Sequence, residues 1–311
     1  MNKEYKLFKI AYAYYVDKLN QEQIAKMHGI SRSNVSMMLN EARKKGIVEV
    51  KVRFPKLYCT DLEKQLEHRF NLDKAIVLQD YSESDGERIS FLAGAAGEYL
   101  DTLVEDNMVI GVSWGKSVYQ VASAMTFHGK TNVLVTPLVG GIGNAINQYH
   151  SNLIASNLAE NIRGTAFGIY APIFVHSDES KELLMGDRQI EEVLNMSRHA
   201  DLAIVGIGNI QHSTMHELDI LKESEIEQLM EEGVVGDINT SFINEQGEEA
   251  ESFLKNRTIG ISLDDLKKIK NVVAVVGGEV KYPPLRSILN NRVINTLIID
   301  DRLAQLLLAR E

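Results

Sequence analysis

The amino-acid sequence predicts an α/β domain with a Rossmann-like parallel sheet, preceded by a small all-α, winged helix-turn-helix domain. Two patterns indicate this fold class. Over residues 19–53, two short amphipathic segments are joined by a glycine and followed by a strand-like segment. From residue 74 onward, runs of Val, Ile and Leu alternate with amphipathic stretches of helical length, which is typical of a parallel sheet covered on both faces. We therefore expect one domain at 1–55 and a second at 56–311.

The spacing of apolar residues predicts three helices in the N-terminal part. A first helix at 4–16 supports two shorter ones. The last helix carries on one face the apolar residues Val35, Met38, Leu39 and Ala42. Gly29 stands between the shorter helices, where a left-handed backbone costs least, and Ser31 is placed to cap the last one. We therefore expect a recognition helix near 31–44 and a wing strand at 47–53.

The polar residues left exposed around the recognition helix have side chains suited to contacts with DNA bases and phosphates. They are Gln21, Ser31, Arg32, Ser33, Asn34, Ser36, Asn40, Arg43 and Lys44. Residues 1–56 carry a net charge of +7 and the remainder −17, within a total of −10. Surplus lysines also occur on the solvated faces of helical domains that bind no DNA. Here the charge coincides with a complete helix-turn-helix pattern, which favours a nucleic-acid partner.

Composition excludes several classes of protein. The single cysteine, Cys59, rules out an internal disulfide and a cysteine-rich metal site. His212 and His216 lack a third ligand, so we expect no metal, and no motif implies a cofactor. The N-terminus is polar, and no apolar run is long enough to span a bilayer. We therefore expect a cytoplasmic protein without membrane contact.

The larger domain is expected to open with a linker helix at 61–72 and then to alternate strands with helices. Apolar runs predict strands at 74–79, 107–113, 132–140, 165–175, 200–208, 271–278 and 294–300. Amphipathic stretches predict helices at 86–104, 116–127, 146–163, 179–197, 262–270, 284–292 and 301–310. The least regular stretch, 209–260, is expected to hold a helix at 216–232 and an antiparallel or peripheral strand pair.

Glycine-rich loops follow four of the predicted strands, where ligands bind in open α/β sheets. The loops are 111–117, 139–144, 206–209 and 277–281. Glycines let backbone amides approach an anion, and a following helix N-terminus favours negative charge. Any single loop is equally well a tight turn, but four at one sheet edge indicate a small phosphorylated or polyhydroxylated ligand. Asp300 is a further pocket candidate and Asp301 a helix-cap candidate.

Two nucleotide-binding motifs are incomplete. Only three residues separate Gly111 from Gly115-Lys116-Ser117, where a P-loop requires four. A dinucleotide fingerprint begins at Gly206, but Gln211 occupies the position of its third glycine. Neither ATP nor NAD is therefore indicated.

The order and spacing of several motifs resemble a known family over essentially the whole chain. These motifs are the helix-turn-helix, SWG at 113–115, VGIG at 205–208, VGD at 235–237 and GGEVK at 277–281. They resemble the SorC/DeoR-type sugar-binding transcriptional regulators. The resemblance implies an effector domain related to sugar-phosphate isomerases and CoA transferases. It also implies operator DNA as a partner, assembly as a dimer of dimers, and control of a carbohydrate-utilisation operon by a phosphorylated sugar.

Carried over by motif, the resemblance implies an effector site in the larger domain. Its residues are Ser113, Gly115, Lys116, Ser117, Gly140, Gly141, Asp237 and Lys281. Lys116, Ser117 and Lys281 would hold the phosphate. The paired glycines would line the pocket, and Asp237 would bind sugar hydroxyls. These side chains have the charge and hydrogen-bonding capacity for such roles, although Lys116 could equally face solvent and Asp237 could equally cap a turn.

Two further points bear on function. Some relatives have an arginine before the paired glycines that helps to hold phosphate, whereas Leu138 and Val139 stand here. The alternative function is a phosphosugar isomerase-like enzyme with an appended DNA-binding head, with Glu279 and Asp237 as the acid–base pair and Lys281 as a Schiff-base lysine. No compact catalytic signature is present in the sequence, so we expect no enzymatic activity. A nucleic-acid-binding module without any small ligand is the third possibility.

Overall fold

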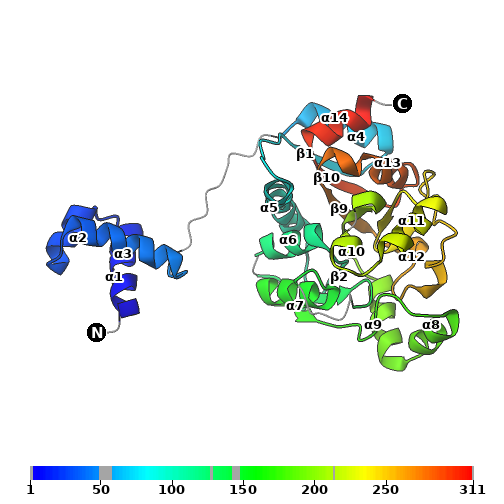
Figure 1. The fold of residues 1–311 in the computed structure, drawn as a ribbon, viewed down its shortest axis with the longest axis horizontal. Coiled ribbons are helices and arrows are strands. Elements are labelled where there is room, and N and C mark those ends of the chain that lie inside the picture. Colours follow the sequence, from blue (N-terminus) through cyan, green and yellow to red (C-terminus); the bar gives the residue numbers. More distant parts are fainter. Residues whose placement is uncertain (1–2, 49–57, 127–128, 142–147, 213, 310–311) are drawn as a thin grey trace. The chain divides into compact units, whose positions relative to one another are not determined.

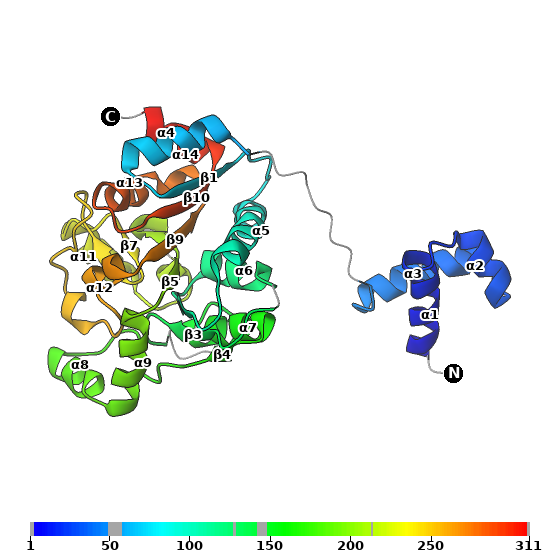
Figure 2. The same cartoon turned by 180° about the vertical axis from the view of Figure 1, so that it is seen from behind.

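The structure is a computed structural model that describes residues 3–48, 58–126, 129–141, 148–212 and 214–309. The chain divides into two compact units, Met1–Pro55 and Lys56–Glu311, each shown from opposite sides in Figures 1 and 2. Within the described ranges, no helix combines the length and apolarity needed to cross a membrane.

The N-terminal unit consists of helices, and local side chains cap the N-termini of the second and third. They are α1 (Lys3–Tyr15), α2 (Gln21–His28) and α3 (Arg32–Lys44). Asn20 caps α2 by accepting the Gln23 amide at 2.9 Å, and the Gln23 side chain accepts the Asn20 amide in return at 2.9 Å. Gly29 has a φ of 63°, and the Ser31 hydroxyl accepts the Asn34 amide at 3.2 Å. The roles predicted for Gly29 and Ser31 are confirmed.

A small apolar core holds these helices together. It is formed by Leu7, Ile10, Ala11, Ala13, Ile24, Ala25, Val35, Leu39 and Ala42. The face predicted for the recognition helix is thus buried, apart from Met38, which is half-buried. Ile47 and Val48 form a bend, and the rest of the predicted wing strand, 49–53, lies outside the described residues.

The larger unit alternates strands and helices over most of its length. In chain order it contains α4 (Thr60–Phe70), β1 (Lys74–Leu78), α5 (Asp85–Leu103), β2 (Val109–Val112), α6 (Lys116–Ala124), β3 (Leu134–Pro137), α7 (Ser151–Ile162), β4 (Thr165–Ala166), α8 (Asp178–Met185), α9 (Arg188–Arg198), β5 (Leu202–Val205), β6 (Ile207–Asn209), η1 (Ile210–His212), α10 (Thr214–Glu217), α11 (Glu223–Glu231), β7 (Gly236–Ile238), β8 (Ser241–Ile243), η2 (Lys255–Arg257), α12 (Leu263–Lys268), β9 (Asn271–Val276), η3 (Glu279–Lys281), α13 (Tyr282–Asn290), β10 (Thr296–Asp300) and α14 (Asp301–Ala309).

One parallel sheet forms the centre of this unit. Its strand order is β1-β10-β9-β5-β2-β3-β4, and every neighbouring pair is parallel. Helices α5, α6 and α7 pack on one face, and α4, α9, α12, α13 and α14 on the other (Figure 1). Alternate residues of a strand point to opposite faces, so Ala75 and Val77 of β1 join one apolar cluster and Ile76 and Leu78 the other. Burial of both faces explains the continuous apolar runs in the sequence.

Three predicted elements are divided in the structure, two of them at breaks of only one or two residues. The apolar run 200–208 divides at Gly206 into β5 and β6, because β6 leaves the parallel sheet for a separate antiparallel sheet, β6-β7-β8. The predicted helix 179–197 divides into α8 and α9. The break occurs because the Asp187 carboxylate accepts two amides from the first turn of α9, at 2.9 and 3.3 Å, which fixes Asp187 in an extended conformation.

The structure differs from two further predictions in this unit. Of the strand predicted at 165–175, only Thr165–Ala166 joins the sheet; Pro172 and Phe174 instead form isolated bridges to Gly141 and Thr258. Proline has no amide proton for a continuous ladder, so this stretch cannot act as a central strand. The helix predicted at 216–232 is divided into α10 and α11. The antiparallel pair expected within 209–260 is confirmed as β7 and β8.

Gly29→Ala should destabilise the N-terminal unit by about 1 kcal/mol, because a left-handed backbone costs an alanine roughly that amount. Amide hydrogen exchange in α2 and α3 should then accelerate about fivefold. Gly86→Ala in α5 is the matched control. An added Cβ meets nothing within 4 Å at either site, but only Gly29 has a positive φ. Exchange in α5 should be unchanged or slower, and equal acceleration in both variants would contradict the explanation.

Candidate functional site

The candidate site lies between β2 and β5, where the direction in which successive strands are added to the parallel sheet reverses. Strands β2 and β5 are neighbours, but the chain continues from β2 to β3 on one side and from β5 to β9 on the other. Such a switch point opens a crevice beyond the carboxyl ends of the two strands. The loops that begin at Ser113, Gly206 and Gly277 leave three adjacent strands here. The predicted site residues of these loops are therefore brought to one edge.

The N-terminus of α6 faces this edge with Lys116 and Ser117 in its first turn. Gly115 begins the helix with a φ of 100°, and no side chain caps the helix within the described residues. The end of β5 approaches closely, because a Cβ added at Gly206 would lie 3.7 Å from Val118 Cγ2 and 4.0 Å from Ser117 Cβ. The first amides of a helix have no partner inside the helix, so this end is suited to an anion.

A buried carboxylate and a half-buried lysine meet at the same edge. Asp237 of β7 is 8% exposed, and its Oδ2 accepts the Thr240 amide at 3.3 Å. Burial raises the pKa of Asp237 to about 6, and the nearby charge of Lys281 opposes that rise. Burial lowers the pKa of the Lys281 ammonium, which Asp237 opposes in turn. A Cβ at Gly208 would lie 1.9 Å from Asp237 Oδ1, so only glycine leaves room for this carboxylate.

A hydrogen bond connects the end of β6 to the loop that carries Lys281. The side chain of Asn209 donates through Nδ2 to the carbonyl of Val280 at 2.6 Å and accepts the Gln211 amide at 2.8 Å. Asn209 is 6% exposed. Since Val280 immediately precedes Lys281, Asn209 positions the lysine. The sequence contained no signal for this role.

Lys116 has a partner that the sequence did not suggest. Its ammonium forms an ion pair with the carboxylate of Glu217 in α10. Both side chains are about half exposed, at 46% and 54%. The two residues lie on elements far apart in the chain, and no motif relates them. The lysine of the predicted phosphate site is thus bound to a carboxylate.

The backbone amides of Gly115, Gly140 and Gly141 already donate hydrogen bonds within the protein, so they are not available to a ligand. The amide of Gly115 donates to the Tyr149 carbonyl at 3.2 Å, that of Gly140 to Ile259 at 3.0 Å, and that of Gly141 to Ala171 at 2.7 Å. A Cβ at Gly140 would lie 2.7 Å from two backbone oxygens. The paired glycines are therefore needed for close packing, and their amides are already used. Ser113, at the end of β2, is buried.

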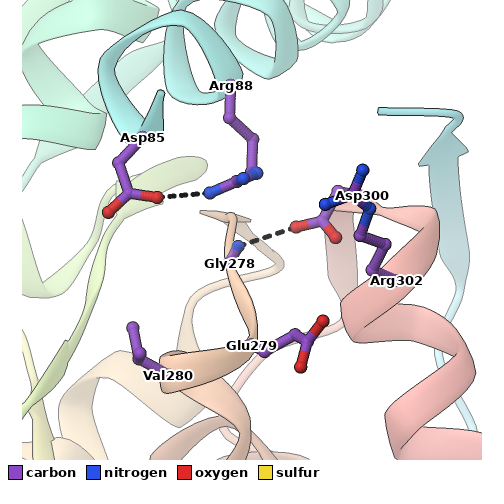
Figure 3. Close-up of a pocket in the computed structure, with 7 residues that line it drawn as sticks. All are labelled: Asp85, Arg88, Gly278, Glu279, Val280, Asp300 and Arg302. Atoms are coloured by element: carbon purple, nitrogen blue, oxygen red, sulfur yellow. Dashed lines mark hydrogen bonds and ion pairs between the residues drawn. The ribbon is translucent and has the colours of Figure 1, made fainter. Parts of the chain in front are cut away.

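A cavity of about 220 Å³ lies beside the Lys281 loop, at the ends of β9 and β10 (Figure 3). It is lined by Asp85, Arg88, Gly278, Glu279, Val280, Asp300 and Arg302. Arg88 donates to Asp80 Oδ2 at 2.6 Å and also pairs with Asp85. The charge of Asp85 acts on the pKa of Lys281, so the cavity adjoins the site.

Asp300 and Asp301 have partly different roles from those predicted. Asp300 lines the cavity as expected, but its oxygens accept the amides of Gly278 at 2.7 Å and Leu303 at 2.9 Å. Asp300 therefore caps α14. The prediction that Asp301 is the cap was wrong, because Asp301 instead accepts the Asp80 amide at 3.0 Å. Within the described part of the chain, no group of three His, Cys, Asp or Glu side chains could hold a metal ion.

The predicted DNA-contacting residues lie at the start of α2 and along α3. Exposed residues are Ser31, Arg32, Ser33, Asn34, Asn40, Arg43 and Lys44, while Gln21 and Ser36 are half-buried. The Ser31 hydroxyl is engaged in capping. Arg43 donates through Nε to the Tyr15 hydroxyl at 2.8 Å, and its guanidinium lies 5.8 Å from that ring's centre. The tyrosine therefore holds Arg43 in place at the end of the recognition helix.

Comparisons with known proteins identify the family. Residues 55–309 match the family described as "Putative sugar-binding domain", and residues 9–45 match sigma-70 region 4. The deoxyribonucleoside regulator of Bacillus subtilis is 30% identical over 94% of this chain and 94% of its own length. The chain belongs to the SorC/DeoR-type sugar-binding transcriptional regulators. The resemblance found in the sequence is confirmed.

Solved structures agree with this assignment. The full-length sorbitol operon regulator SorC of Klebsiella pneumoniae matches this SorC/DeoR-type regulator with a TM-score of 0.74 at 26% identity, over 98% of this chain and 99% of that one. A DeoR family regulator from Listeria monocytogenes matches with a TM-score of 0.75 at 34% identity, over 80% of this chain and 98% of that one. The predicted fold class, an N-terminal helix-turn-helix followed by a mostly parallel α/β domain, is confirmed.

The raised pKa of Asp237 makes the stability of this regulator depend on pH. Between the unfolded pKa of about 3.9 and the folded value of about 6, the folded state binds more protons. The contribution of this carboxyl to stability therefore falls as the pH rises through that window, and is constant above it. Asp237→Asn removes the titration.

We compare the free energy of unfolding of the wild type with that of Asp237→Asn. The difference, wild type minus variant, should fall by about 2 kcal/mol from pH 4.5 to 7.5. Urea denaturation of both proteins at each pH measures this difference. A difference that stays constant with pH would show that Asp237 is not buried as described.

Proposed function

We propose that this regulator acts in the cytoplasm on a carbohydrate-utilisation operon, and that a phosphorylated sugar sets its affinity for operator DNA. The unit Met1–Pro55 binds DNA, and Lys56–Glu311 binds the effector and assembles the chain as a dimer of dimers. One recognition helix covers too few base pairs to specify an operator, so at least two copies act together. The names of two relatives, a deoxyribonucleoside regulator and a sorbitol operon regulator, support this class of effector.

The observation that carries the proposal is the meeting of two lysines with a buried carboxylate at the sheet's switch point. The charges of Lys116 and Asp237 both act on the pKa of Lys281, which places the three groups in one electrostatic neighbourhood. A phosphate is bound by cations together with amide and hydroxyl donors. Lys116, Lys281, Ser117 and the uncapped first turn of α6 supply these. Asp237, ionised above pH 6, accepts hydrogen bonds from sugar hydroxyls.

A thermal-shift screen of sugar phosphates on the full chain tests the proposal. A ligand that binds only the folded state raises the melting temperature in proportion to the logarithm of its concentration. We expect a rise with at least one sugar phosphate and none with the same sugar lacking phosphate. The absence of any rise would contradict the proposal, and steady conversion of a sugar phosphate would favour the enzymatic alternative.

Lys281→Ala should abolish the effector response while operator binding stays within about twofold of the wild type. Loss of a charge-assisted hydrogen bond costs about 1.5–3 kcal/mol, which weakens effector binding roughly 10- to 100-fold. Calorimetric titration with the effector found in the screen measures this. Lys268→Ala in α12, an exposed lysine that pairs with Asp265, should leave effector binding unchanged. An unaltered response in Lys281→Ala would remove this lysine from the site.

Arg32→Ala and Asn34→Ala should each weaken operator binding by about 5- to 100-fold, since a specific base contact contributes about 1–3 kcal/mol. Fluorescence anisotropy with labelled operator, at one fixed salt concentration, gives the dissociation constants. The thermal shift caused by the effector should be unchanged in both variants. Lys9→Ala, which removes a charge from α1, should have a smaller effect. Normal binding by both variants would mean that the DNA-contacting face is placed wrongly.

A further inference from the structure

The ion pair between Lys116 and Glu217 joins two segments of the larger unit at the candidate site. Lys116 is the first residue of α6, and Glu217 is the last residue of α10. The partner of this carboxylate is therefore the cation predicted to hold phosphate. Nothing in the sequence motifs assigns a role to Glu217.

Both ends of this pair are fixed by one apolar cluster. Trp114, two residues before Lys116, belongs to the same buried cluster as Met215, two residues before Glu217. Met215 is 1% exposed, and its carbonyl accepts the amides of Ile220 and Leu221 at 2.8 and 3.3 Å. The backbone segments that carry the two charges are therefore both anchored in one buried cluster.

The charges around Lys281 show the consequence of this pair. The groups that act on the pKa of Lys281 are Asp237, Lys116, Asp85 and Glu217. Asp85 is itself paired with Arg88, whereas Glu217 lies directly against Lys116. A phosphate group, with a charge of about −1.5 to −2, therefore enters more favourably when Glu217 leaves Lys116.

We propose that Glu217 is a specificity-determining residue of the effector site, which competes with the phosphate group of the ligand for Lys116. Binding at Lys116 is then an exchange of anions. A phosphate, with its higher charge and several oxygens, displaces the carboxylate. An uncharged sugar hydroxyl does not, because it cannot replace a carboxylate beside an ammonium ion. The inference rests on the proposed phosphate site and adds a residue that selects phosphorylated over unphosphorylated sugars.

Glu217→Gln tests this competition, because the substitution keeps the shape of the side chain and removes its charge. Inorganic phosphate is titrated calorimetrically into the full-length wild type and variant at pH 7.5 and low salt. An exposed ion pair is worth roughly a 1.4- to 5-fold change in an equilibrium constant, so we expect Glu217→Gln to bind phosphate about 2- to 5-fold more tightly. The far-ultraviolet circular dichroism of the two proteins should be the same.

Glu223→Gln is the matched control. Glu223 begins α11, is 68% exposed and pairs with His216 at 2.8 Å rather than with Lys116. We expect its affinity for phosphate to stay within 1.5-fold of the wild type (roughly the limit for an exposed pair that does not involve the site). An equal gain in both variants would show a general charge effect and overturn the competition.

The remaining outcomes separate this inference from the proposed function. Phosphate binding by the wild type, with equal or weaker binding by Glu217→Gln, would overturn the competition alone. Absence of binding to either protein at millimolar phosphate would overturn both the competition and the phosphate site on which it rests.

Discussion

The site depends on one constraint, the reversal of strand order between the parallel strands β2 and β5. In a parallel sheet every strand ends at the same edge, and the reversal leaves a crevice at that edge where two neighbouring strands diverge. Lys116 and Lys281 follow strands of this sheet that are distant in sequence, and its topology brings them to one edge. Asp237 joins them from β7 of the antiparallel sheet, which pairs with β6 directly after β5. Packing of helices on both faces of the sheet fixes the strands, so the loops that carry these residues start from a rigid base.

Burial of charge gives this edge its chemical character. Asp237 is kept in a space that only a glycine at position 208 allows, and burial raises its pKa. Lys281 is kept near it by the hydrogen bond from Asn209 to Val280. Lys116 is neutralised by Glu217. We propose that a ligand with both an anionic group and hydroxyls satisfies these groups together.

Local patterns made much of this structure predictable, and long-range contacts account for the rest. The capping by Ser31, the left-handed Gly29 and most strand positions follow from short-range spacing, so the sequence indicated them. The predicted loops 111–117 and 277–281 lie at the ends of β2 and β9, whereas 206–209 largely forms β6 and residues 142–144 of the loop 139–144 lie outside the described residues. The partner of Lys116, by contrast, depends on the apolar cluster to which both Trp114 and Met215 belong. The use of the Gly140 and Gly141 amides depends on where the chain places Ile259 and Ala171. Such contacts join residues far apart in sequence, and no local pattern encodes them.

We propose that a phosphorylated sugar bound at the sheet edge controls the affinity of the helix-turn-helix for DNA. The most direct measurement is the dissociation constant of the full-length protein for its operator, by fluorescence anisotropy at fixed salt, with and without a saturating sugar phosphate. We expect one phosphorylated sugar to change this constant at least tenfold, a typical allosteric coupling of about 1.4 kcal/mol, and its unphosphorylated form to leave it unchanged. An operator affinity that no sugar phosphate alters, or that the unphosphorylated sugar alters equally, would contradict it.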